Sequence, residues 1–247
     1  MVSHPSIWRQ PPERLALNRE DVHVWRARLN QPASTVKFFR SILSPDELRR
    51  ADSFYFQKDR AGFIVARAVL RTIISRYLGV SPIAVRFCYG RHGKPALAEE
   101  SGEKGLRFNI SHSHELALYV VACDREVGID LEYIRRDFAS QEIARHFFSP
   151  REVSTLCALP ASVQTEAFFN CWTRKEAYIK ATGQGLALPL HQFDVSLSPG
   201  EPAALLGSRE HPQESSRWTL LELAPGEGYV AALAVEGHDW RINRWQF

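Results

Sequence analysis

Two short segments carry the charged residues best suited to chemistry in this chain of 247 residues. Asp130 and Glu132 lie two residues apart in the segment GIDLEYI, and Glu176 and Lys180 lie four residues apart in the segment WTRKEAYIK. Carboxylate oxygens are the ligands that Mg²⁺ prefers, and a lysine ammonium group stabilises a phosphate. Together, these three acids and one lysine predict a site for a hard cation and a phosphate.

Each pair also has a simpler interpretation. Alternating acids often mark the solvated face of a strand, and a Glu and a Lys four residues apart form a surface ion pair worth about 0.3 kcal/mol. Spacing alone favours these interpretations. The apolar neighbours of Asp130 weigh against the first, because two uncompensated charges on a buried strand are costly. The aromatic segment FFNCW before Glu176 weighs against the second, because it indicates a mostly buried helix.

Two further segments have residues that can bind an anion. The segment GRHGKP has two glycines that allow close backbone approach, and Arg91 and Lys94 supply positive charge; an ordinary basic turn is the alternative. In the segment FNISHS, the Ser and His side chains at the end of a strand can donate to an anion, although His112 has a structural role as its alternative. The GxSxG elbow of serine hydrolases and the P-loop pattern GxxxxGK[ST] are both absent from the sequence.

The elements that position these residues are predicted from local patterns. Residues 127–133 alternate as a strand, with Val127, Ile129 and Leu131 on the face opposite the acids. Capping boxes at 44–47 and 149–152 each open a short helix, and a longer helix is expected at about 59–77. Residues 116–123 and 127–133 are expected to form a hairpin that turns at 124–126. Further strands are expected at 21–30, 84–89, 106–111, 218–223, 228–235 and 240–247, with a surface loop at 198–216.

The second half of the chain repeats the first in outline. The two capping boxes are 105 residues apart, and the same offset places Phe168 on Phe63 and Glu176 on Arg71. An internal duplication would pack two α/β halves around a pseudo-twofold axis. The long helix of the first half would then present a basic face, formed by Arg60, Arg67 and Arg71, and that of the second half an acidic, metal-binding face.

Composition sets the broad class of protein. The chain is 45% hydrophobic and 24% charged, and its net charge of +3 is too small to indicate nucleic-acid binding but suits anionic ligands or acidic partner proteins. No stretch approaches the roughly 18 consecutive apolar residues of a membrane helix. The N-terminus lacks the apolar core of a signal peptide, and the four cysteines lack CxxC spacing. We therefore expect a cytoplasmic protein with buried free thiols, and no nucleic-acid or membrane partner.

The order of motifs, GKP, FNISHS, GIDLE, FFSPRE and WTRKEAYIKATGQGL, resembles that of the 4′-phosphopantetheinyl transferases of the Sfp type. The resemblance extends from about residue 44 to residue 197. It implies an α+β fold of two pseudo-symmetric α/β subdomains, each a small, mainly antiparallel sheet packed with helices. We assign residues 1–124 to the first subdomain and 125–247 to the second, which carries the acids, and expect a monomer.

The resemblance also implies an activity. It implies an Mg²⁺-dependent enzyme that transfers the 4′-phosphopantetheine group of coenzyme A to a serine of an apo acyl or peptidyl carrier protein, releasing 3′,5′-adenosine bisphosphate. By similarity the metal ligands are Asp130, Glu132 and Glu176, and the catalytic residues are Glu176, Lys180 and Asp130. The residues expected to bind coenzyme A are Lys58, Arg91, Gly93, Lys94, Asn109, Ser111, His112 and Lys180. A protein that binds coenzyme A without transfer, and another Mg²⁺-dependent enzyme acting on nucleotides, are the competing hypotheses.

Overall fold

The computed structural model describes residues 7–90, 94–98, 105–135 and 137–247. Its helices are α1 (Ala33–Arg40), α2 (Pro45–Asp52), α3 (Gln57–Leu78), α4 (Gln141–Phe147), α5 (Pro150–Ala158), α6 (Ala161–Thr182) and α7 (Glu214–Arg217), with short 3₁₀ turns at Pro82–Ala84, Gly185–Ala187 and Leu190–Gln192. Its strands are β1 (Asp21–Arg28), β2 (Phe87–Tyr89), β3 (Pro95–Leu97), β4 (Leu106–Ser113), β5 (Leu116–Cys123), β6 (Val127–Tyr133), β7 (Phe193–Val195), β8 (Leu205–Ser208), β9 (Trp218–Leu223), β10 (Tyr229–Glu236) and β11 (Arg241–Gln246).

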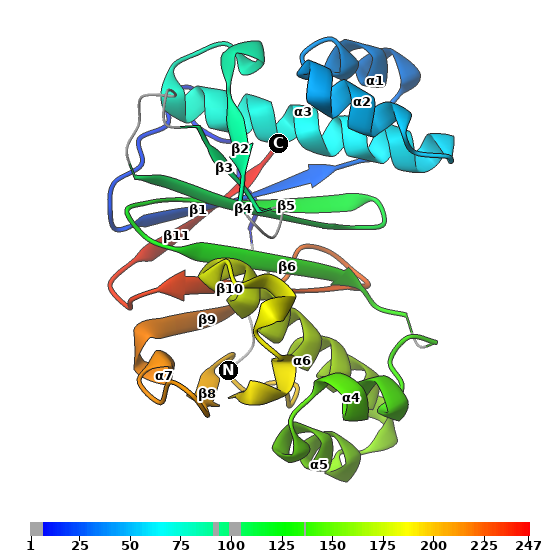
Figure 1. Cartoon of the computed structure of the whole chain (residues 1–247), viewed down its shortest axis with the longest axis vertical. Helices are drawn as coiled ribbons and strands as arrows, with labels where there is room; N and C mark the ends of the chain where they lie inside the picture. The colour runs from blue at the N-terminus through cyan, green and yellow to red at the C-terminus, as the bar shows by residue number, and fades with distance from the viewer. Residues whose placement is uncertain (1–6, 91–93, 99–104, 136) are drawn as a thin grey trace.

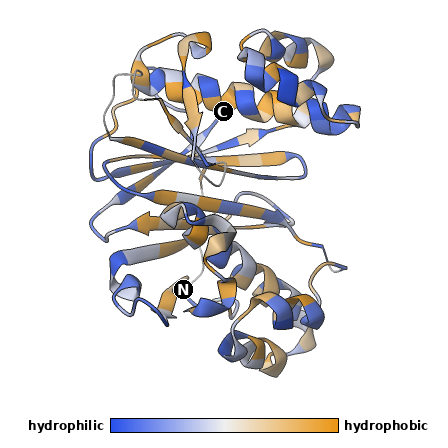
Figure 2. Cartoon of the chain, viewed as in Figure 1, coloured by the Kyte–Doolittle hydropathy of each residue, from blue (hydrophilic) through white to orange (hydrophobic). Residues whose placement is uncertain are grey.

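Two sheets and two long helices form four layers (Figure 1). The first sheet has the order β11-β1-β5-β4 and the second the order β6-β10-β9. Aliphatic side chains such as Val120, Leu131 and Leu233 fill the space between the sheets, and the strands carry much of the apolar sequence (Figure 2). Helix α3 covers the outer face of the first sheet and α6 that of the second. The α+β fold with two small, mainly antiparallel sheets is confirmed.

The long helices α3 and α6 have the same length and the same ends. Each has 22 residues and ends at a glycine in the left-handed conformation, Gly79 with φ 66° and Gly183 with φ 70°. A side chain is strained at such φ values, so glycine suits both ends. Each long helix follows a short helix with the predicted capping box, at Ser44 for α2 and at Ser149 for α5, and both boxes are confirmed.

A buried ion pair anchors each long helix to the short helix before it. Arg71 Nε lies 2.6 Å from Glu47 Oε2, and Lys175 Nζ lies 2.8 Å from Glu152 Oε2. Both acids occupy the third helical position of their capping boxes. Both cations also donate to two backbone carbonyl groups beyond the helix: those of Pro82 and Val85 in the first half, and those of Leu190 and Phe193 in the second. The same network in both halves supports the internal duplication.

This network corrects two details of the predicted repeat. Arg71 is equivalent to Lys175 and not to Glu176, because the long helices and their glycine ends match at an offset of 104 residues while the capping boxes match at 105. The predicted basic face that includes Arg71 is also wrong, since this side chain is 2% exposed and paired with Glu47.

Strand pairing differs from the predicted hairpin of residues 116–123 with 127–133. Strand β5 pairs with β1 and β4, whereas β6 pairs with β10, so the chain passes from one sheet to the other between them. Both edges of β5 are occupied in its own sheet, and its residues are buried except for the partly exposed Cys123. At the crossing, Asp124 has φ 50°. The last strand, β11, returns from the second half to pair with β1 in parallel.

Three smaller points complete the fold. Of the four cysteines only Cys171 is buried, so the expectation of buried thiols is wrong for Cys88 and Cys157, which are exposed. The segment expected to be a surface loop at 198–216 contains β8 and the first residues of α7. In the described part of the chain, no helix is both long enough and apolar enough to span a membrane.

Candidate active site

A cavity of about 450 Å³ brings together most of the residues predicted to do chemistry. Helices α3 and α6 and strands β3, β4 and β6 supply its walls. All three predicted acids and Lys180 line it, as do three members of the FNISHS segment. The lining residues are Phe63, Ala66, Arg67, Pro95, Ile110, Ser111, His112, Asp130, Glu132, Trp172, Glu176 and Lys180.

The acids reach the cavity because β6 alternates as predicted. Val127, Ile129 and Leu131 are fully buried between the two sheets, so the side chains between them point to the other face. Helix α6 crosses that face at Gly128. A Cβ atom at Gly128 would lie 2.1 Å from the carbonyl oxygen of Ala177, so only glycine permits this approach. The close crossing brings Glu176 and Lys180 of α6 beside the acids of β6.

Asp130 lies at the centre of this arrangement and is 3% exposed. Its Oδ1 atom accepts hydrogen bonds from Ser111 Oγ at 2.9 Å and from Lys180 Nζ at 2.5 Å. Its Oδ2 atom is buried and has no hydrogen-bond partner among the described residues. A buried carboxylate oxygen without a partner is costly, and a bound cation would satisfy it.

The other two carboxylates are destabilised in their charged forms. Burial and the negative charges of Asp130 and Glu132 together raise the pKa of Glu176 to about 7, although the positive charge of Lys180 opposes this shift. Burial and the charge of Asp130 also raise the pKa of Glu132. No described residue donates a hydrogen bond to Glu176. The acids therefore repel one another in a partly desolvated cavity where Lys180 supplies positive charge.

The acids fit a divalent cation by chemistry but are not arranged around one. Asp130 Oδ2, Glu132 and Glu176 offer the oxygen ligands that Mg²⁺ prefers, in a place where a cation would relieve their repulsion. Within the described ranges, however, no three His, Cys, Asp or Glu side chains lie close enough together to hold a metal ion. All three acids could bind a single ion only after side-chain movement, although Mg²⁺ often uses one or two carboxylates together with substrate phosphates.

Several residues expected to bind coenzyme A are not in the cavity wall. Lys58 is exposed in the first turn of α3, and Asn109 is buried, with its Oδ1 atom accepting from the backbone N–H of Ile129 at 3.1 Å. Neither residue lines the cavity. Arg91 and Gly93 lie outside the described residues.

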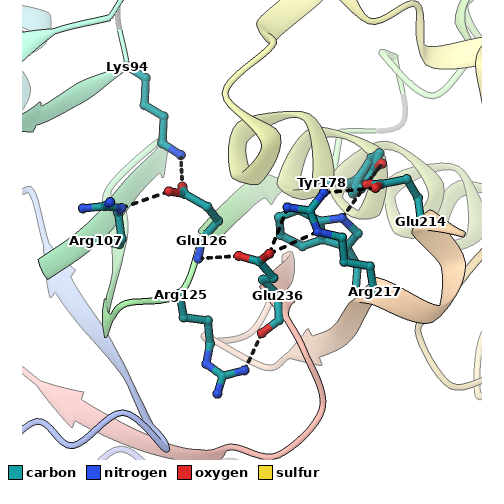
Figure 3. A network of polar contacts seen from close by, with 9 residues as sticks. Lys94, Arg107, Arg125, Glu126, Tyr178, Glu214, Arg217 and Glu236 are labelled. Atoms are coloured by element: carbon teal, nitrogen blue, oxygen red, sulfur yellow. Dashed lines mark hydrogen bonds and ion pairs between the residues drawn. The ribbon is translucent and has the colours of Figure 1, made fainter. Parts of the chain in front are cut away.

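Lys94 belongs to a polar network at the junction of the two halves (Figure 3). Its ammonium group lies 3.6 Å from Glu126, which also pairs with Arg107, and donates to the carbonyl oxygen of Ala181 at 3.2 Å. From there the network continues through Glu236 to Arg217 at the end of α7, and on to Glu214 and Tyr178 (Figure 3). Lys94 thus connects the first half to the C-terminal end of α6, although it does not line the cavity.

Six lining residues were not predicted as site residues: Phe63, Ala66, Arg67, Pro95, Ile110 and Trp172. Arg67 also lines a neighbouring cavity of about 290 Å³. Its guanidinium group lies 5.7 Å from the ring centre of Phe87 and 5.6 Å from that of Tyr89. The seven-residue spacing of Arg60 and Arg67 placed them on one helix face. That pattern did not distinguish Arg67, which lines the cavity, from Arg71, which is buried against Glu47.

Comparison with known proteins gives consistent matches over the whole chain. A family profile described as "4′-phosphopantetheinyl transferase superfamily" matches residues 126–234, and one described as "4′-phosphopantetheinyl transferase, N-terminal" matches residues 25–125. The 4′-phosphopantetheinyl transferase HetI of Nostoc sp. is 44% identical, with 100% of both chains covered. The 4′-phosphopantetheinyl transferase Sfp of Bacillus subtilis is 35% identical, over 82% of this chain and 86% of that relative. A solved ACPS–CoA complex of Chronobacterium ammoniagenes is 25% identical, with a TM-score of 0.34 over 46% of this chain and 98% of that one.

Proposed function

The chain belongs to the 4′-phosphopantetheinyl transferase superfamily, and from that membership we propose that its cavity binds coenzyme A and Mg²⁺ for transfer to a carrier protein. The enzyme transfers the 4′-phosphopantetheine group of coenzyme A to a serine of an apo acyl or peptidyl carrier protein. The second product is 3′,5′-adenosine bisphosphate. The observation that carries the assignment of the site is the convergence of Asp130, Glu132, Glu176 and Lys180 on one cavity between the two halves.

The reaction is a displacement at the β-phosphorus of coenzyme A. The carrier serine oxygen forms a bond to this phosphorus, and the bond from phosphorus to the oxygen of the departing adenosine bisphosphate breaks. We assign Glu176 as the acceptor of the serine proton, since it lines the cavity together with Asp130 and Lys180 and a carboxylate can serve as a general base. Lys180 would stabilise the negative charge on the departing phosphate.

Asp130, Glu132 and Glu176 would hold the Mg²⁺ ion, which neutralises charge on the diphosphate when it is bound. The chain itself supplies orientation. Ser111 fixes one oxygen of Asp130 and leaves the other for a ligand, and Lys180 lies against the same carboxylate. Because phosphoryl transfer asks the protein mainly for positioning and charge neutralisation, these residues suffice for the proposed chemistry.

The binding residues for coenzyme A follow the family resemblance. Ser111 and His112 line the cavity and would contact its phosphates. Lys94 would have to leave Glu126 to do so. Coenzyme A binding stays a prediction for four further residues: Lys58, Arg91, Gly93 and Asn109.

The wider organisation is also part of the proposal. We propose two subdomains, residues 1–124 and 125–247, with β11 returning to the first sheet. The cavity draws on both halves of one chain, so a monomer has both sides of the site. We propose a cytoplasmic enzyme whose macromolecular partner is the carrier protein.

The test is to incubate the protein with apo carrier, coenzyme A and Mg²⁺ and to weigh the carrier by mass spectrometry. A gain of one phosphopantetheine supports the proposal, and chelation of Mg²⁺ should abolish the gain. Consumption of coenzyme A with an unchanged carrier would favour another Mg²⁺-dependent nucleotide enzyme. No change in either would favour a binding protein.

Variants test the assigned residues. Glu176→Gln and Asp130→Ala should each lower the transfer rate by several orders of magnitude with the fold intact, whereas Glu166→Gln, an exposed acid on the same helix α6, should not. Full activity of Asp130→Ala would refute the metal assignment. Lys180→Ala should lower turnover more than coenzyme A affinity, and an equal loss in both would indicate ground-state binding instead.

A further inference from the structure

Strands β4 and β6 lie side by side, but side chains replace the usual backbone ladder between them. Three alternate residues of β4 accept hydrogen bonds from three alternate backbone N–H groups of β6. The pairs are Asn109 Oδ1 with Ile129 at 3.1 Å, Ser111 Oγ with Leu131 at 3.2 Å, and Ser113 Oγ with Tyr133 at 3.1 Å. We call these three contacts the side-chain ladder.

The two serines of the side-chain ladder also reach the acids. Ser111 Oγ donates to Asp130 Oδ1 at 2.9 Å, and Ser113 Oγ donates to Glu132 Oε2 at 3.0 Å. Each hydroxyl accepts from a backbone N–H, so its own proton is directed at the carboxylate. Asn109 makes the same backbone contact but no contact with an acid.

The equivalent junction in the first half is built differently. There β11 lies along the edge of β1, also in parallel, through an ordinary backbone ladder. Strand β1 with its partner β5 corresponds to strand β6 with its partner β10. Trp25 pairs with the fourth residue of β5, and Asp130 pairs with the fourth residue of β10, so Trp25 is the counterpart of Asp130. Trp25 is fully buried beside Trp245. The first half, with Trp25 at this position, therefore has the backbone ladder, and the second half, with Asp130 there, has the side-chain ladder.

We propose that Ser113 is a positioning residue that fixes Glu132 for cation binding. Its hydroxyl group holds Oε2 and leaves Oε1 as the oxygen that can bind a cation. The inference rests on the proposed function, in which Glu132 is one of the Mg²⁺ ligands. Ser113 is the informative serine because Ser111 lines the cavity and could contact the substrate directly, whereas Ser113 is not among the lining residues.

The test measures metal affinity without turnover. Mn²⁺, a paramagnetic substitute for Mg²⁺, is titrated into the full-length protein at saturating coenzyme A and without carrier, and free Mn²⁺ is followed by electron paramagnetic resonance. Ser113→Ala should weaken Mn²⁺ binding about tenfold, as expected when a partner that orients a metal ligand is lost. Ser113→Thr, which keeps the hydroxyl group, should restore the affinity. Unfolding by urea gives the stability of each variant.

Ser140→Ala is the matched control, because it makes the same change at a hydroxyl that accepts from a backbone N–H, that of Ile143 at 3.2 Å, at the start of helix α4 and away from the acids of the site. It should lower the unfolding free energy and leave the Mn²⁺ affinity near that of the unaltered protein. In transfer assays, high Mg²⁺ should rescue Ser113→Ala.

Unchanged Mn²⁺ affinity in Ser113→Ala, or an equal loss in Ser140→Ala, would overturn the role of Ser113 and leave the proposed function standing. If the unaltered protein binds no Mn²⁺ but still modifies the carrier, the metal assignment falls and this inference falls with it.

Discussion

A methyl group added at Gly128 should move the site residues of helix α6 away from those of strand β6. The Gly128→Ala variant places a Cβ atom 2.1 Å from the carbonyl oxygen of Ala177 and 2.3 Å from the backbone nitrogen of Ala181. Both atoms belong to the backbone of helix α6, so no side chain can rotate away. Helix α6 must move off strand β6 by about 1 Å to restore ordinary contact distances.

Two effects follow from this displacement. Overpacking of a tightly packed core costs about 1–3 kcal/mol, and the free energy of unfolding should fall by that amount or more. Glu176 and Lys180 move with the helix, and Lys180 Nζ now lies only 2.5 Å from Asp130. A misplacement of about 1 Å at a catalytic site lowers the rate by roughly a hundredfold, so transfer should fall by about that factor even where the protein is fully folded.

Urea unfolding and the rate of carrier modification measure the two effects separately. Two controls make the same chemical change where there is space: Gly207→Ala in strand β8 and Gly62→Ala in helix α3 have no atom within 4 Å of the new Cβ. Both should keep their activity, and Gly62→Ala should gain stability because alanine favours a helix. A Gly128→Ala protein with unaltered stability and transfer rate would refute the close crossing of α6 over β6.

Other perturbations test the elements around the site. Lys175→Met should lower the free energy of unfolding, measured by urea denaturation, by about 3–5 kcal/mol, because it leaves Glu152 charged and buried. The double variant with Glu152→Gln should recover part of this loss. Full stability of the single variant would contradict this account. Burial lowers the pKa of His23 to about 4, below its unfolded value of 6.5, so this residue should remove about 3 kcal/mol of stability as the pH falls from 6.5 to 4. The free energy of unfolding should fall less steeply with decreasing pH in His23→Phe than in the unaltered protein. Identical slopes in the two proteins would argue against a buried neutral His23. Gly183→Ala should cost about 1 kcal/mol in thermal unfolding because φ is 70° at the end of α6, and Gly183→Asn should cost less; equal stability of all three proteins would argue against the left-handed conformation.

Local patterns in the sequence were enough to predict the elements that carry the site. The alternation of residues 127–133 placed Asp130 and Glu132 on one face and the aliphatic residues on the other, and the structure has this arrangement. Both capping boxes were also predicted correctly. Such features depend on residues within one or two turns of each other, so a single sequence contains the information for them. The order of motifs added the family.

Contacts between distant segments were decided only in the tertiary structure. The sequence could not show that β5 and β6 join different sheets, that β11 returns to β1, or that Arg71 is buried against Glu47. Strand partners and buried ion pairs depend on which edges and faces remain uncovered once the whole chain is packed. The same holds for Ser113, whose hydroxyl is one of many along the sequence until β4 lies beside β6 and directs it at Glu132.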